Sequence, residues 1–190
     1  MDPGRLKARL HGDRMDRAGV DRLVGELLGS PGAVEMLLEE IRNGEGEGHF
    51  QASWVLDHLL RKRLDQLLPH MREFTLLLPG LKNGSCIRCL SHTCEMLCIA
   101  AFKKRLAPFR EGIDHGQWER IMVASFDHLI GPLGMAPKVF AMTSLYYLGL
   151  EFPWIHPELR AVLEATYASG SIGYRNRAKK TLALLDRTAP

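Results

Sequence analysis

Apolar residues recur every three or four positions from Val20 almost to the C-terminus, and this spacing limits what the chain can fold into. The first such run holds Val20, Leu23, Val24 and Leu27. This spacing gathers apolar side chains on one face of an α-helix. Connections rich in Pro and Gly, such as residues 79–84, separate the runs, and no convincing period-two strand pattern occurs. We therefore predict an all-α fold.

A small residue also recurs at a long period. It is found at Ala52, Cys89, Ala141 and Ala178, which are 37, 52 and 37 positions apart. Each is followed by apolar or compact residues three, four and seven positions later. A period in the high thirties is typical of solenoids in which stacked helix pairs bury one another's apolar faces. We therefore expect an α-α superhelix of about four stacked antiparallel helix pairs, with an insertion near residues 99–116.

Three stretches carry this pattern most clearly: PKVFAMTSLYYLGLEFP, SIGYRNRAKKTLALL and FQASWVLDHL. In them the chain resembles the HEAT-repeat family and, within it, a group of uncharacterised short bacterial HEAT-like proteins. The resemblance spans about residues 31–187. It implies helix pairs whose second helices line a concave surface, although a fold of this kind does not by itself specify a function.

The two ends of the chain differ in character. Residues 1–19 carry several charges and no long apolar face, so we expect a flexible N-terminal arm, with one short helix within it as an open alternative, before a single repeat domain over 20–190. The sequence shows neither a secretory signal nor a membrane-spanning run. We therefore expect a cytoplasmic protein that makes no membrane contact, with its four cysteines kept as thiols. The oligomeric state is left open.

The four cysteines, Cys86, Cys89, Cys94 and Cys98, raise the question of a metal site, with His92 among them. At 100° per residue they fan around a helix and do not converge on one ion. Cysteine is also an ordinary small core residue. We expect no metal and no other cofactor, and we expect His92 to be a hydrogen-bonded core histidine.

Catalytic patterns are weak. Ser125, Asp127 and His128 lie close in sequence, but neighbours on a helix do not form a nucleophile–base–orienter geometry by spacing alone. Whether the protein is an enzyme stays open, with no catalytic residue assigned. An alkylpurine DNA glycosylase of the HEAT-like kind is one alternative, for which Trp54 with Asp57 and Trp154 are the tentative counterparts of that family's groove aromatics and carboxylate.

A stripe beside the core positions of the second helices supplies the candidate binding residues. Tyr, Trp and Arg are common anchors of protein interfaces. The predicted site consists of Trp54, His58, Arg88, Glu95, Tyr147, Arg177 and Lys180. Packing between helix pairs is the alternative role for Trp54 and for the neighbouring stripe residue Phe140.

Basic residues cluster at 61–63, 103–105 and 175–180. Each cluster lies toward the C-terminal half or the end of a predicted helix, where cations interact favourably with the helix dipole. If the clusters share a face, they would instead contact phosphates. The function that we expect is a non-catalytic adaptor that binds a protein or peptide on its concave surface, and a nucleic-acid-binding module is a further alternative.

Overall fold

Helices make up the regular structure of this protein. The computed structural model describes residues 1–43 and 46–188. Its elements are α1 (Pro3–Leu10), α2 (Arg17–Leu27), α3 (Ala33–Asn43), α4 (Gly46–Lys62), the 3-10 helix η1 (Leu64–His70), α5 (Met71–Leu77), the 3-10 helix η2 (Leu78–Gly80), α6 (Gly84–Cys98), the π-helix η3 (Ile99–Lys103), α7 (Ala107–Glu111), α8 (His115–Ile130), α9 (Met135–Leu148), α10 (Ile155–Thr166) and α11 (Ile172–Thr188). Within the described ranges there is no strand, so the predicted all-α class is confirmed. None of these helices has the length and apolar character needed to cross a membrane.

The chain forms two compact units, which we call unit 1 (Met1–Thr93) and unit 2 (Cys94–Pro190). The division falls inside α6. This differs from the expected arrangement of an arm (1–19) and a single domain (20–190), because the N-terminal residues pack into unit 1.

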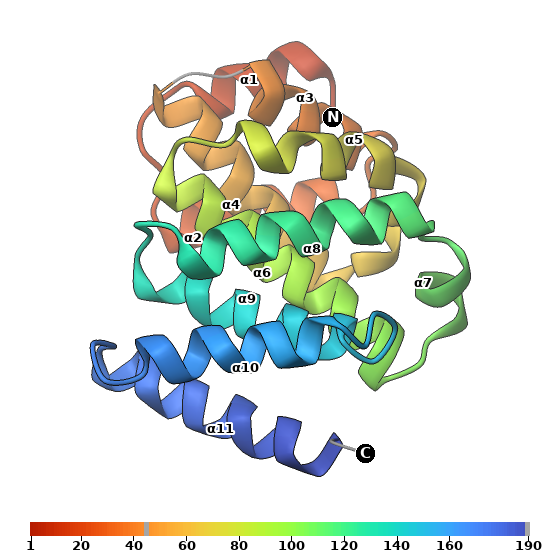
Figure 1. Cartoon of the computed structure of the whole chain (residues 1–190). Coiled ribbons are helices and arrows are strands. Elements are labelled where there is room, and N and C mark those ends of the chain that lie inside the picture. The colour runs from red at the N-terminus through yellow and green to blue at the C-terminus, as the bar shows by residue number, and fades with distance from the viewer. Residues whose placement is uncertain (44–45, 189–190) are drawn as a thin grey trace. The chain divides into compact units, whose positions relative to one another are not determined.

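Helix α4 is the centre of unit 1, where α1, α2 and α3 pack against it (Figure 1). Its side chains Val55, Leu56 and Leu59 are completely buried. Leu37 of α3 and Leu23 of α2 are buried as well, in agreement with the helical spacing of apolar residues in both segments.

The expected N-terminal arm contains one short helix, α1, which packs into unit 1. Asp2 caps this helix, since its carboxylate accepts hydrogen bonds from the first-turn backbone N–H groups. Leu6 and Leu10 are buried. Gln51, itself fully buried on α4, donates to the Leu10 carbonyl at 2.9 Å and accepts from the Met15 N–H at 2.7 Å. Two leucines in so short a helix give little periodic signal. The hydrogen bonds from Gln51 cannot be predicted from the sequence around α1, because Gln51 is far away in the chain.

Helix α9 holds unit 2 together through contacts with α8, α10 and α11. Leu145 and Leu148 on α9 are fully buried, and so are Leu159 and Leu163 on α10. Helix α10 also packs on α11, which follows it in the chain (Figure 1). The apolar faces predicted from the C-terminal repeats are therefore the faces that unit 2 buries.

The small repeat residues occupy close helix contacts. Ala52, Cys89, Ala141 and Ala178 lie on α4, α6, α9 and α11 and are all buried. The helix pairs α3/α4, α8/α9 and α10/α11 are each in contact. The predicted helix pairing is supported at these three places, and the stacking of the pairs into a superhelix remains a prediction.

Candidate functional site

Three of the predicted binding residues lie in unit 1. Trp54 is half-buried and stacks on Phe50, with ring centroids 5.7 Å apart. His58 meets the indole of Trp54 edge-on and is itself buried, with its Nδ1 3.4 Å from the Asp21 carboxylate. Arg88 is exposed. The structure thus gives Trp54 and His58 packing roles in place of the expected surface role, and it leaves Arg88 accessible.

The other four predicted binding residues lie in unit 2. Glu95 is buried, and the Arg177 guanidinium lies 3.8 Å from its carboxylate. Arg177 also donates to the Thr143 hydroxyl at 2.8 Å, so the structure brings this pair together from α6 and α11. Tyr147 is half-buried and Lys180 is exposed. These contacts hold Glu95 and Arg177 in place inside the unit and leave Lys180 as the most accessible of the four.

Asp57, the carboxylate of the glycosylase alternative, is bound on both oxygens. Its Oδ1 lies 2.5 Å from His92 Nδ1, and its Oδ2 accepts from the Arg61 guanidinium at 2.6 Å and 3.1 Å. Burial raises the pKa of the Asp57 carboxyl, but the hydrogen bonds from His92 and Arg61 outweigh it and bring the pKa below its ordinary value. His92, predicted as a hydrogen-bonded core histidine, is half-buried and bonded. Asp57 therefore serves the packing of unit 1.

The four cysteines are free thiols, and all of them are buried. Burial raises the pKa of Cys89 and Cys94 to about 12, and it raises the pKa of Cys86 and Cys98 above the ordinary thiol value. These thiols stay protonated at neutral pH and behave as small apolar side chains. Among the residues that the structure describes, no three or more His, Cys, Asp or Glu side chains are grouped so that they could hold a metal ion.

A pocket of about 360 Å³ lies in unit 2, and we call it the aromatic pocket. It is lined by Phe102, Arg105, Ala107, Arg110, Glu111, Ile113, His115, Trp118, Glu151 and Phe152. Its residues come from the end of η3, the short helix α7, the start of α8 and the loop that follows α9. The volume lies at the lower end of the range usual for ligand sites.

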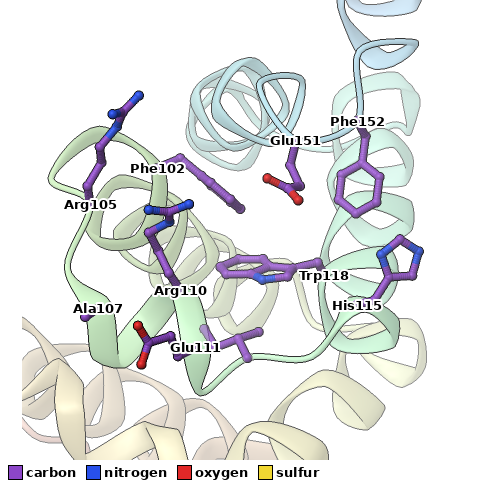
Figure 2. A pocket seen from close by; sticks show the side chains of 10 residues that line it. Phe102, Arg105, Ala107, Arg110, Glu111, His115, Trp118, Glu151 and Phe152 are labelled. Atoms are coloured by element: carbon purple, nitrogen blue, oxygen red, sulfur yellow. The ribbon is translucent and has the colours of Figure 1, made fainter.

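Aromatic rings form the floor and one wall of this pocket. Trp118 packs against Phe102, with ring centroids 4.8 Å apart and planes tilted by 50°. His115 packs against Phe152 with centroids 5.1 Å apart. Figure 2 shows Trp118 beside Phe102 at the centre of the group, with His115 and Phe152 on one side. Trp118 is only 5% exposed, so its ring is held rigidly beneath the pocket, and the half-buried rings of Phe102 and Phe152 offer more accessible surface.

Charged side chains surround the rings. Arg105, Arg110 and Glu111 come from the side opposite Phe152, where Arg110 is turned toward the rings and the ends of Arg105 and Glu111 are turned away, and Glu151 reaches in from the loop after α9 (Figure 2). All four are exposed, and none of them forms an ion pair or a side-chain hydrogen bond with another described residue. The pocket thus offers two guanidiniums and two carboxylates whose hydrogen-bonding capacity is still open to a ligand.

Irregular backbone builds the pocket on the η3 side. The helix widens to a π-helix, in which the Lys104 N–H donates to the Ile99 carbonyl at 2.9 Å. Arg105 then adopts a φ of 52°, the left-handed conformation that usually falls to glycine at a helix end. Within the described residues it is the one non-glycine residue with positive φ. π-Helical segments and strained residues of this kind cluster at functional sites.

Local sequence signals fix the other walls. Asp114 and Gln117 form a capping box that starts α8 and so positions Trp118 in its first turns. The His156 ring lies against Gly149, where any Cβ would come within 2.0 Å of it, and its Nε2 donates to the Tyr146 carbonyl at 2.9 Å. This contact anchors the loop after α9, which carries Glu151 and Phe152.

The pocket occupies the stretch where the sequence predicts an insertion. Pro108 and Gly112 break the helical period there, and the repeat spacing lengthens from 37 to 52. The sequence alone does not predict a binding role for this stretch, since Phe102 and Trp118 are 16 positions apart and meet only in the fold. The signal that points to the site is the irregularity in the repeat.

No protein-family model, curated protein or solved structure matches this chain. The HEAT-like resemblance therefore remains an expectation from the repeat pattern. The aromatic pocket combines rigidly held rings with exposed charged groups of both signs.

Proposed function

We propose that this chain is a non-catalytic helical adaptor that binds a segment of a partner protein, with the aromatic pocket as its main contact. The observation that carries the proposal is the combination of rigid rings with unpaired charges of both signs. A peptide exposes backbone donors and acceptors together, so a site holding both guanidiniums and carboxylates can satisfy both. An aromatic floor supplies most of the apolar contact in such interfaces.

Exposed apolar side chains elsewhere in unit 2 also support a protein partner. Ile130 and Val123 on α8 are 63% and 52% exposed, and Trp154, stacked on Phe126 with centroids 6.1 Å apart, is 52% exposed. Apolar side chains gathered at the surface are typical of protein interaction sites. They offer further apolar area that a protein partner can cover.

The accessible residues of the predicted site extend this proposal. Arg88 and Lys180 are exposed, and Tyr147 is half-buried. If the helix pairs of unit 2 stack as in HEAT-like proteins, Lys180 and Tyr147 would face the partner on a concave surface. A cytoplasmic location belongs to the same proposal, because four unpaired thiols suit a reducing compartment.

Peptide selection tests the function. Peptides selected from a random displayed library on the immobilised protein would be measured by fluorescence anisotropy against Arg110→Glu and Glu151→Arg. Each reversal should weaken binding by about tenfold or more while leaving the melting temperature unchanged. Arg72→Glu, an exposed arginine of unit 1, is the matched control. Peptides that bind both pocket variants as well as they bind the parent protein would contradict the proposal.

A nucleic-acid-binding role is the second candidate, and one observation favours it. Lys103 and Lys104 are exposed next to Arg105 at the edge of the aromatic pocket. Aromatic rings beside a row of cations are the chemistry of single-strand binding. This role predicts binding of a labelled thymidine oligonucleotide that falls steeply with salt and is lost in Lys103→Glu. Absence of binding at low salt would reject it.

The glycosylase alternative receives less support. Asp57 is buried and bound to two partners, and no observation links it to a base-sized cavity. Excision of alkylated bases by the purified protein, lost in Asp57→Asn, would nevertheless establish it. An inactive protein that binds peptide in the aromatic pocket would favour the adaptor.

A further inference from the structure

We infer that the aromatic pocket takes the C-terminal residue of its partner, with an aromatic side chain on the floor and the terminal carboxylate on the arginines. This inference rests on the proposed adaptor function and makes it specific. It follows from the size of the pocket, the balance of charge around it and the way in which its cations are held.

Size favours the end of a chain. A cavity of about 360 Å³ accommodates one aromatic residue with its terminal carboxylate and part of the residue before it. The ring of that residue would pack on the half-buried Phe102, with Trp118 in contact beneath it. Phe152, half-buried on the opposite wall, would close over it.

Charge favours a carboxylate at that end. Arg105 and Arg110 are both unpaired with described residues, and a carboxylate accepts two parallel hydrogen bonds from one guanidinium. An internal peptide segment offers only neutral carbonyl oxygens there, and these form weaker hydrogen bonds with a guanidinium than a carboxylate does. A terminal carboxylate is therefore the stronger partner.

The remaining charges decide between the two kinds of chain end. Glu111 and Glu151 would attract an N-terminal ammonium, and the lining as a whole is balanced, with two arginines and two glutamates. Figure 2 shows the Arg110 side chain turned toward the rings and the Glu111 carboxylate turned away from them. A carboxylate end would therefore meet Arg110 beside the rings, and Glu151 remains to accept a backbone N–H of the bound residue.

Backbone geometry supports the same assignment. Arg105 is held in the left-handed conformation at the end of η3, closed by the hydrogen bond from the Leu106 N–H to the Ala100 carbonyl at 3.0 Å. Arg110 lies on α7, one turn long and capped at Gly112. Both guanidiniums therefore extend from short, fixed segments, so that fewer conformations are lost when they bind.

Four capped tetrapeptides test the inference by fluorescence anisotropy. They are acetyl-Gly-Ser-Gly-Phe with a free carboxylate, the same peptide as its C-terminal amide, acetyl-Gly-Ser-Gly-Ala with a free carboxylate, and acetyl-Gly-Phe-Gly-Ser amide with an internal ring. We expect the first to bind about 10- to 100-fold more tightly than each of the others. In Arg110→Gln the carboxylate peptide should bind only as well as its amide, while Arg72→Gln should keep the preference.

The outcomes separate this inference from the adaptor function. If the amide and the internal-ring peptide bind as tightly as the free acid, and Glu151→Arg weakens all three, the pocket binds peptides but does not select a terminus, and the inference is overturned. If no tetrapeptide and no selected peptide depends on Arg110 or Glu151, the adaptor function fails with it. Thermal unfolding of each variant separates loss of binding from loss of folding.

Discussion

Unit 1 and unit 2 use the same types of residue in opposite ways. In unit 1 the Asp57 carboxylate of α4 is buried beside Trp54 and His58 in the same helix, and both of its oxygens are bound, by His92 and Arg61. In unit 2 the arginines and glutamates around Trp118 are exposed and unpaired with described residues. The difference teaches that a polar cluster near an aromatic ring is structural where its groups satisfy one another, and is available for binding where they do not.

The comparison predicts its largest effect on stability at Asp57. Asp57→Asn replaces a buried acceptor with an amide whose N–H₂ faces the donors His92 and Arg61. The free energy of unfolding should fall by about 2–4 kcal/mol, measured by urea denaturation. Asp65→Asn, which removes a surface ion pair with Arg63, should have a much smaller effect. Equal losses in the two variants would show that the Asp57 contacts contribute no more than a surface pair.

Close helix packing should give the next largest effect, and it should appear in both units. Ala52→Leu and Ala141→Leu place three extra carbons in contacts where these alanines are buried. We expect each to lower the free energy of unfolding by about 1–3 kcal/mol. Ala183→Leu, on an exposed part of α11, should be close to neutral. Tolerance of both buried substitutions would contradict the close approach inferred at the repeat positions.

Replacing Arg105 should weaken peptide binding without lowering the stability of the fold. Arg105→Gly removes the side chain from a left-handed position, so the free energy of unfolding should stay level or rise by up to about 1 kcal/mol. Peptide binding in the aromatic pocket should weaken. Lys104→Gly, at an ordinary helical φ of −82°, should instead lower the free energy of unfolding by about 0.5–1 kcal/mol. A destabilised Arg105→Gly variant with unchanged binding would mean that this residue supports the fold and not the site.

The smallest effect is a dependence of stability on pH. Burial lowers the pKa of His58 in unit 1 and of His128 in unit 2. The unfolded chain, with histidine near its ordinary pKa of about 6.5, then binds more protons than the native chain. Stability should therefore be fully present above that pH and should fall as the pH drops through it toward the lowered native values. His58→Gln should flatten part of this dependence in urea titrations between pH 8 and about 5, and an unchanged slope would exclude His58 as a source.

Much of the fold was predictable, because helical spacing and buried small residues leave a local record in the sequence. The repeat positions Ala52, Cys89, Ala141 and Ala178 are all buried, as their pattern indicated. The role of α1 was not predictable, because it depends on Gln51, more than 40 positions away from the leucine carbonyl that it binds. Long-range polar contacts of this kind leave no periodic pattern in the sequence.

The site was predictable only as an irregularity. The sequence pattern does not show that Arg88 is exposed and His58 is buried, since both residues fall beside the core stripe of a helix. The aromatic pocket depends on rings brought together from η3, α8 and the loop after α9, in the pairs Phe102–Trp118 and His115–Phe152. Its one trace in the sequence is the lengthened repeat around Pro108 and Gly112.

The three tryptophans allow one direct measurement of where the protein binds. Trp54 lies on α4 in unit 1, Trp118 forms the floor of the aromatic pocket, and Trp154 lies exposed beyond it in unit 2. Their indole N–H signals, assigned with Trp→Phe variants, would be followed by two-dimensional NMR while the Phe-terminated tetrapeptide is added. Our account predicts that the Trp118 signal shifts to saturation while the Trp54 signal stays in place. A shift at Trp54 with Trp118 unchanged would contradict it.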